Sequence, residues 1–260
     1  MVKIINKRKH GNLFHYAHFF CDCLYPEIVN HIYKHKHVFR LKTIHQTLGN
    51  FKDIYQNVMN NKSIELLKED FNKLTEEIIV INDRFNYTDD KSLSMFKEYI
   101  FNRYLINPLV YDIHYPEVVL IKRGDRRSLI DDEYLSSINE NVTNGKERRE
   151  IKDIEQVEST LIDMYGIKFK SFYLENETFH EQIKIFNNAK IIILAYGAAM
   201  CNMFFCKAGT TIIEITCDKK WPFFDIVSKN SNLNHIKITT NNAPHIISFL
   251  NKHNSEHPIN

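Results

Sequence analysis

Residues 195–215 read AYGAAMCNMFFCKAGTTIIEI, and they follow the apolar run KIIIL at 190–194. The run KIIIL does not alternate between apolar and polar side chains, which is typical of a strand that is covered on both faces. Gly197 then allows a tight turn, and the small residues after it can form a short helix over 198–205. A second buried strand is expected at 210–215. This order of strand, helix and strand predicts a parallel sheet wrapped by helices.

The same alternation of strands and helices extends over the second half of the chain. In residues 147–166 apolar residues recur at helical spacing, and Gly166 is placed to cap that helix at its C-terminus. The remaining elements that we expect in this half are strands at 116–122, 167–174 and 235–239 and helices at 179–189 and 245–253. The pattern therefore predicts an α/β fold.

The first half is less regular, but it fits the same fold class. It contains strand candidates at 2–6, 38–42 and 77–82 and helix candidates around 15–34, 50–75 and 91–105. The prolines that follow Asn107 and Tyr115 bias these two residues away from helical conformation, and the two positions bracket a boundary. We expect an N-terminal, acceptor-side α/β domain over 1–114 and a C-terminal, Rossmann-like domain over 115–244, with a last helix at 245–260 that can pack back on the first domain.

Composition narrows the class of protein. The chain has 260 residues, of which 43% are hydrophobic and 25% charged, which is ordinary for globular domains. The formal net charge is +2, so no overall positive field marks a nucleic-acid-binding protein. No apolar run has the length of a membrane span, and the N-terminus lacks the pattern of a signal peptide, so we expect a cytoplasmic location. The odd number of cysteines, five, favours reduced thiols.

The strand, the Gly197 turn and the helix after it are typical of an element that binds phosphate. The start of a helix offers unpaired N–H groups and a partial positive charge. In a parallel sheet this turn lies at the carboxyl edge, where ligands bind. A close-packed turn without a ligand fits this stretch equally well. The GxGxxG motif of NAD-binding proteins is absent, which argues against a dehydrogenase.

Charged residues stand at two further strand ends. Arg123, Arg126 and Arg127 follow the first strand of the second half, and a guanidinium group suits the charges of a diphosphate. A solvated basic loop is the alternative, and the position at a strand end favours anion binding. Glu214 ends the strand that follows the Gly197 turn. Its carboxylate could accept hydrogen bonds from two ribose hydroxyls, or it could be buried in an ion pair with a lysine or arginine.

Four segments in a fixed order, IKRGDRRSL, EQIKIFNNA, YGAAMCNMFF and AGTTIIEI, resemble the motifs of glycosyltransferase family 61. The segment HGNLFHYAHFFCDCLYPEI at 10–28 is similar to the family's N-terminal motif, so the resemblance spans most of the chain. It implies a GT-B fold, in which two Rossmann-like domains face each other across a cleft. The chain is short for two full domains of this kind, so we expect the N-terminal one to be trimmed. The resemblance further implies an inverting enzyme that uses a UDP-sugar donor and a glycan or glycoprotein acceptor, without a metal or other cofactor. The absence of an Asp-x-Asp motif agrees with the last point.

The resemblance also implies a set of residues that bind the nucleotide sugar. Besides the arginines, Gly197 and Glu214, the motifs place Gln182, Tyr196, Ala198, Asn202 and Thr210 in this set. The family's turn usually begins with histidine, where this chain has Tyr196. A phenol carries no charge at neutral pH, so this difference leaves open a second interpretation, a nucleotide-sugar-binding or scaffold protein without catalytic activity.

An inverting transfer needs a base that accepts the proton of the acceptor hydroxyl. His18 and Asp22 are four residues apart and share one helical face if 15–24 is helical. Either side chain could be the base while the other orients it. The alternative is a buried histidine with a satisfied partner and a structural carboxylate.

Overall fold

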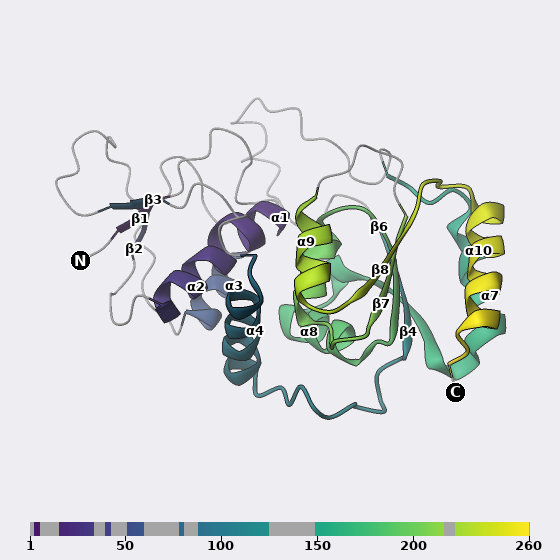
Figure 1. Cartoon of the computed structure of the whole chain (residues 1–260), viewed down its shortest axis with the longest axis horizontal. Coiled ribbons are helices and arrows are strands. Elements are labelled where there is room, and N and C mark those ends of the chain that lie inside the picture. Colours follow the sequence, from purple (N-terminus) through teal and green to yellow (C-terminus); the bar gives the residue numbers. More distant parts are fainter. Residues whose placement is uncertain are drawn as a thin grey trace. The chain divides into compact units, whose positions relative to one another are not determined.

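The structure is a computed structural model that describes residues 3–5, 16–33, 40–42, 51–59, 78–80, 88–124, 149–215 and 222–259 (Figure 1). The described residues divide into two compact units, and the boundary lies between Asn107 and Pro108. Each unit has its own parallel β-sheet. Within the described ranges, no helix combines the length and the apolar character needed to cross a membrane.

Five parallel strands form the sheet of the second unit, in the order β5-β4-β6-β7-β8. Their bounds are Val118–Lys122 for β4, Phe169–Tyr173 for β5, Ile191–Ala195 for β6, Thr211–Ile215 for β7 and Asn234–Ile238 for β8. The chain passes from β4 to β5 on one side and then returns to the other side of β4 to form β6. Such a reversal of strand order opens a crevice outside the carboxyl ends of the two central strands. All five strands lie at predicted positions to within two residues, and the α/β class is confirmed.

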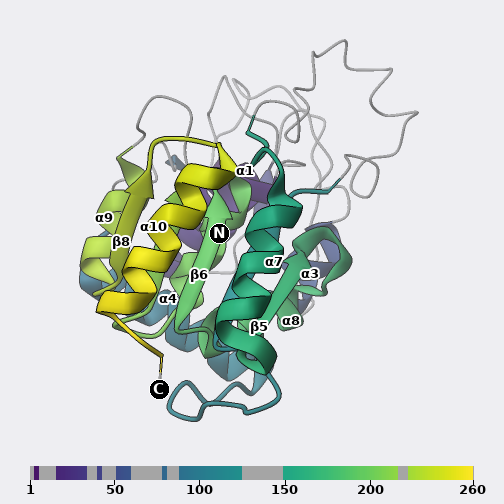
Figure 2. The same ribbon diagram turned by 90° about the vertical axis from the view of Figure 1, so that its right-hand side faces the viewer.

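Helices cover both faces of this sheet. On one face α7 (Ile154–Tyr165) and α10 (Ala243–Glu256) lie side by side, as Figure 2 shows. On the other face lie α8 (Phe179–Asn188), the 3₁₀ helix η8 (Ala198–Phe205) and α9 (Phe223–Asn230) (Figure 1). The apolar residues of α10 belong to the core of the second unit, where they pack with those of α7 and with the sheet. The helix α9 was not expected from the sequence.

Local sequence accounts for the central part of this unit. Every residue of β6 is buried, which confirms that both faces of this strand are covered. Burial of one large aliphatic side chain contributes about 1.5–3 kcal/mol, so the isoleucines of β6 stabilise the centre of the sheet. The helix α7 ends at Gly166, whose φ of 52° is left-handed, as a C-terminal glycine cap requires. The predicted short helix after Gly197 forms with 3₁₀ geometry.

The described part of the first unit contains a smaller sheet and five helical segments. Three parallel strands, β1 (Lys3–Ile5), β2 (Arg40–Lys42) and β3 (Ile78–Val80), lie within the predicted ranges and pair in the order β2-β1-β3. The helical segments are α1 (Tyr16–Phe19), the π-helix η1 (Phe20–Leu24), α2 (Tyr25–Tyr33), α3 (Lys52–Val58) and α4 (Asp90–Tyr104). The predicted helices around 15–34 and 91–105 are confirmed. Most of the predicted helix around 50–75 lies outside the described residues.

Aromatic side chains form the core between the helices of the first unit. Phe19 stacks on Phe51, with ring centres 4.8 Å apart. Phe20 and Tyr25 both meet Phe96 of α4 edge to face, at 5.4 and 4.8 Å. These are the ring geometries that the aromatic quadrupole favours. The contacts fix the orientation of the helical segment that carries His18 and Asp22.

A buried carboxyl group lies in the same unit. Glu27 of α2 accepts a hydrogen bond from the Tyr55 hydroxyl at 2.6 Å through Oε2 and one from the Cys23 thiol at 3.6 Å through Oε1. Burial raises the pKa of Glu27 from 4.5 to about 7, although both hydrogen bonds act in the opposite direction. Burial also raises the pKa of Cys23 and of Tyr55, so both groups keep the protons that they donate.

Glu27 is expected to make the stability of the first unit depend on pH. Its pKa in the folded state, about 7, is above the ordinary value of 4.5, so folding binds a proton between these values. The contribution of Glu27 to the free energy of unfolding is therefore fully present below pH 4.5 and is lost as the pH rises through 7. The loss amounts to about 3 kcal/mol at most. Hydrogen exchange of the α2 amides at pH 5 and pH 8 measures this loss. Glu27→Gln should remove it, and an equal pH dependence in wild type and variant would contradict the assignment.

Candidate functional site

Arg123 and the Gly197 turn meet at the carboxyl edge of the second sheet. Arg123 follows β4 and Tyr196–Gly197 follow β6, so they flank the position at which the strand order reverses. Arg123 Nη1 donates a hydrogen bond to the Tyr196 carbonyl oxygen at 3.3 Å. A Cβ at Gly197 would lie only 3.0–3.3 Å from three atoms of the Arg123 guanidinium. Glycine therefore serves here for the close approach of the arginine, because the backbone itself is extended, with a φ of 162°.

A second arginine, Arg149, reaches the same carbonyl group. It lies in the segment that precedes α7, and its Nη1 donates to the Tyr196 carbonyl oxygen at 3.4 Å. Its guanidinium carbon lies 4.6 Å from the centre of the Tyr196 ring, in cation–π geometry. We did not single out Arg149 from the sequence, where it is one of several charges in KERRE. Two guanidinium groups at one oxygen concentrate positive charge in a way that suits a diphosphate. We call Arg123, Arg149 and the Tyr196–Gly197 turn the switch-point cluster.

The side chain of Tyr196 is held on two sides. The Arg149 guanidinium lies over one part of its ring, and the Phe224 ring of α9 meets it edge to face at 6.1 Å. The Tyr196 N–H donates to the carbonyl oxygen of Ile215 at 2.9 Å, which ties the turn to the end of β7. Ala198 follows as the first residue of η8, where a helix leaves backbone N–H groups without partners inside the helix. The turn therefore presents fixed backbone and ring groups beside the two arginines.

Gln182, which is half-buried, and Asn202 contact each other in the second unit. The Asn202 Nδ2 group donates to Gln182 Oε1 at 3.1 Å, and Asn202 is fully buried. Gln182 Nε2 donates to the carbonyl oxygens of Leu174 and Glu177 at 2.8 and 3.2 Å. The structure brings the two predicted residues together, in a network that ties α8 to η8 and to the end of β5. Their positions in the motifs could not distinguish this arrangement from ligand binding.

Glu214 belongs to a buried polar network between the sheet and α9. It is 3% exposed, and its Oε2 lies 2.8 Å from His235 Nε2. The other nitrogen of His235, Nδ1, lies 3.3 Å from Asp225 Oδ1, which also pairs with Lys237. Glu214 thus contacts a histidine, and not the lysine or arginine that the sequence left open as its partner. The proposed contact with a ribose would have to compete with this histidine.

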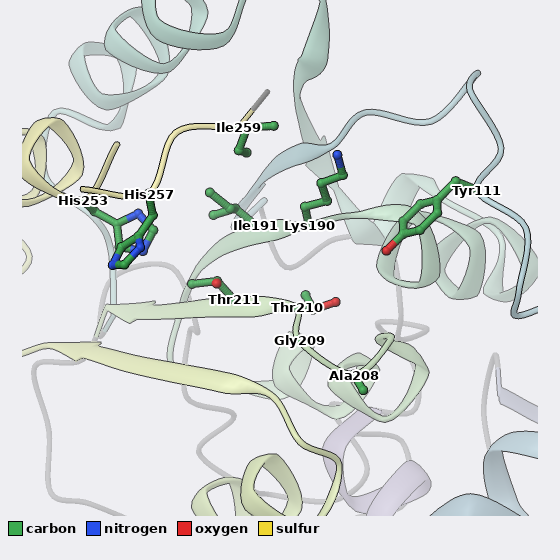
Figure 3. A pocket seen from close by; sticks show the side chains of 10 residues that line it. All are labelled: Tyr111, Lys190, Ile191, Ala208, Gly209, Thr210, Thr211, His253, His257 and Ile259. Carbon is green, nitrogen blue, oxygen red and sulfur yellow. The ribbon is translucent and has the colours of Figure 1, made fainter. Parts of the chain in front are cut away.

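Thr210 lies at the opposite edge of the sheet from the switch-point cluster. It directly precedes β7, and its hydroxyl donates to the Ala189 carbonyl oxygen at 3.3 Å. It lines an open pocket of about 270 Å³. Figure 3 shows it there together with Thr211, Lys190 and the neighbouring rings of His253 and His257. The structure therefore does not bring Thr210 together with Arg123 and Gly197. Arg126 and Arg127, the other predicted arginines, lie outside the described residues.

The candidate base in the first unit has a defined geometry. His18 of α1 and Asp22 of η1 are joined by a contact of 2.7 Å between Nδ1 and Oδ2. The side chain of His18 is 31% exposed and that of Asp22 only 4%. The two residues share one helical face, as the spacing predicts. A solvent-facing imidazole oriented by a buried carboxylate is the arrangement of a general base.

Among the described side chains, no group of three or more histidine, cysteine, aspartate or glutamate residues is arranged to hold a metal ion. A comparison with known protein families finds a match to the family described as Glycosyltransferase 61, over residues 16–213. This range includes His18 and Asp22 as well as the whole switch-point cluster. No curated protein matches the chain.

Proposed function

Since this chain belongs to glycosyltransferase family 61, we propose that it transfers a sugar from a UDP-sugar to a hydroxyl group of a glycan or protein. The transfer inverts the anomeric centre and needs no metal ion. The observation that carries the proposal is the convergence of Arg123 and Arg149 on the Tyr196 carbonyl oxygen, at the reversal of strand order. In open parallel sheets this is the place where nucleotides bind.

The switch-point cluster binds the diphosphate in this proposal. Arg123 and Arg149 donate hydrogen bonds to its oxygens, and the first N–H groups of η8 point toward the same charge. As the bond between the anomeric carbon and the diphosphate breaks, the electron pair leaves with UDP. The arginines stabilise the negative charge that develops there, which is the largest single contribution in many group transfers.

His18 is the base in this proposal, and Asp22 is the group that orients it. The acceptor hydroxyl attacks the anomeric carbon and gives its proton to His18 as the new glycosidic bond forms. The exposure of His18 and the burial of Asp22 support this assignment of the two roles. The GT-B arrangement is part of the same proposal, supported by the presence of a parallel sheet in each unit.

A catalytically inactive binding protein is the second candidate function. The observation that favours it is Tyr196, which carries no charge and has its ring occupied by Arg149 and Phe224. Release of UDP from a donor distinguishes the two functions. An enzyme releases UDP from its donor with an acceptor or slowly with water, whereas a binding protein leaves the donor intact.

We expect titration of the purified protein with UDP to give binding heat, with and without EDTA. The physical reason is that the proposed diphosphate site consists of arginines and backbone N–H groups alone. Isothermal titration calorimetry measures both conditions. An absence of heat with UDP and with other nucleotides would contradict both candidate functions. Loss of the heat in EDTA would contradict metal independence.

A further inference from the structure

Glu175 lies at the same edge of the sheet as the switch-point cluster. It belongs to the 3₁₀ turn Leu174–Asn176, which directly follows β5, and it is half-buried. Its carboxylate lies against Gly124, the second residue after β4: a Cβ at Gly124 would be 1.5 Å from Glu175 Oε1. The missing side chain of Gly124 is therefore what lets the carboxylate occupy this place beside Arg123. Among the described residues, the Glu175 carboxylate has no hydrogen-bond or ion-pair partner.

Two nearby carboxylates at the carboxyl ends of the strands are already engaged. Glu158 of α7 pairs with Lys122 at 2.8 Å and accepts a hydrogen bond from Ser171. Glu214 is buried against His235. A half-buried carboxylate without such a partner loses part of its hydration and is a ready acceptor for hydroxyl groups of a ligand.

The strand order sets the distance between Glu175 and the proposed diphosphate. Arg123 and Gly197 flank the crevice between β4 and β6, and β5 lies on the other side of β4. Neighbouring strands are about 4.8 Å apart, so Glu175 is displaced from that crevice by roughly one to two strand spacings. In a nucleotide sugar, one sugar ring is attached to each end of the diphosphate. A sugar ring at one end of a diphosphate in the crevice therefore comes within reach of the β5 end of the edge.

We propose that Glu175 accepts hydrogen bonds from sugar hydroxyls of the nucleotide-sugar donor. The inference rests on the proposed function. It gives to Glu175 the contact with sugar hydroxyls that the sequence led us to expect for Glu214. Two adjacent hydroxyl groups match the two oxygens of a carboxylate, and both the ribose and the transferred sugar can supply such a pair. A site of this kind binds analogues that lack the hydroxyl groups more weakly, because the carboxylate of the protein is then left without a hydrogen-bond donor.

The first experiment compares wild type with Glu175→Gln by calorimetric titration of UDP, 2′-deoxy-UDP, UDP-N-acetylglucosamine and UDP-xylose. If Glu175 binds the ribose, the variant loses about ten- to hundredfold in UDP affinity and no longer prefers UDP to the deoxy analogue. If it binds the transferred sugar, UDP affinity stays unchanged and the affinity for a UDP-sugar falls by a similar factor. Glu177→Gln, a carboxylate two residues away, is the matched control and should leave all affinities unchanged.

Gly124→Ala provides an independent test. The new Cβ would displace the flexible end of Glu175, and Gly124 does not have the left-handed φ that would make alanine strained. The variant should keep the wild-type melting temperature and lose ligand affinity to the same extent as Glu175→Gln. The double variant should be no weaker than either single variant, since all three remove the same contact.

The outcomes separate this inference from the proposed function. If wild type does not bind UDP or a UDP-sugar, the proposed function fails and the role of Glu175 fails with it. If wild type binds, but Glu175→Gln and Gly124→Ala keep every affinity and the preference for UDP over its deoxy analogue, the role of Glu175 alone is overturned. If Gly124→Ala loses affinity and Glu175→Gln does not, the loss has another cause and the inference is again overturned.

Discussion

Replacing Arg123 and Arg149 together by alanine is expected to lower the affinity for UDP by about two to four orders of magnitude. A hydrogen bond to a charged group contributes about 1.5–3 kcal/mol, and each 1.4 kcal/mol corresponds to a factor of ten. The two guanidinium groups meet at one carbonyl oxygen, so a single phosphate group can contact both. We therefore expect each single variant to lose about ten- to hundredfold. Calorimetric titration of UDP into the three variants measures the loss.

Two further variants show whether the guanidinium group or only its charge is needed. Arg123→Lys keeps the charge but loses the planar fork, so its UDP affinity should lie between those of wild type and Arg123→Ala. Lys252→Ala is the matched control for a change of one unit charge, because Lys252 is a 73% exposed lysine of the same unit on α10. If the double alanine variant binds UDP as wild type does, the diphosphate does not bind at the switch-point cluster.

The strands of the second unit could be predicted because their apolar runs are short, dense and separated by helical patterns. The same periodicity does not say which strands are neighbours. The order β5-β4-β6 depends on the side of the sheet to which the chain returns after β5, and no local pattern encodes that choice. The three short strands of the first unit were also predicted, whereas α9 was missed. Its sequence places two aromatic residues at the helix start, where we expected no helix.

The candidate site was predictable to the extent that it lies directly at strand ends. Arg123 and Gly197 each stand within two residues of a strand, so a parallel sheet necessarily brings them to one edge. Arg149 lies far along the chain from β4, and only folding places it on Tyr196. Gln182 and Asn202 stand in suitable motifs, yet their amides bond to each other and to backbone carbonyl groups. A motif gives the position of a polar residue, and packing decides whether it faces a ligand.

Glu214 illustrates the same limit within one strand. Adjacent residues of a strand point to opposite faces, and Ile213 and Ile215 both lie in the core that α7 and α10 cover. Glu214 must therefore point toward the layer that contains α9, where His235 and Asp225 also lie. Each face of the strand TTIIEI carries an isoleucine, so the sequence alone could not show which helices cover the face of Glu214.

Removal of the base is expected to have the second large effect, on the rate of transfer. His18→Ala and Asp22→Asn should each reduce the transfer rate, by about 10²- to 10⁴-fold for the histidine, the usual contribution of general base catalysis. UDP affinity should stay unchanged in both variants, because His18 and Asp22 belong to the first unit and the diphosphate site to the second. Steady-state transfer assays and UDP titration of the same preparations measure the two quantities.

The two variants should differ in their response to added imidazole. In His18→Ala the missing base can be replaced from solution, because the side chain of His18 is 31% exposed, so part of the rate should return. In Asp22→Asn the imidazole of His18 is still present but loses the carboxylate that orients it at 2.7 Å, so added imidazole should have no effect. Asp53→Asn, an exposed carboxylate of α3 in the same unit, is the control and should retain the wild-type rate. Transfer at the wild-type rate in both His18→Ala and Asp22→Asn would show that another residue accepts the proton.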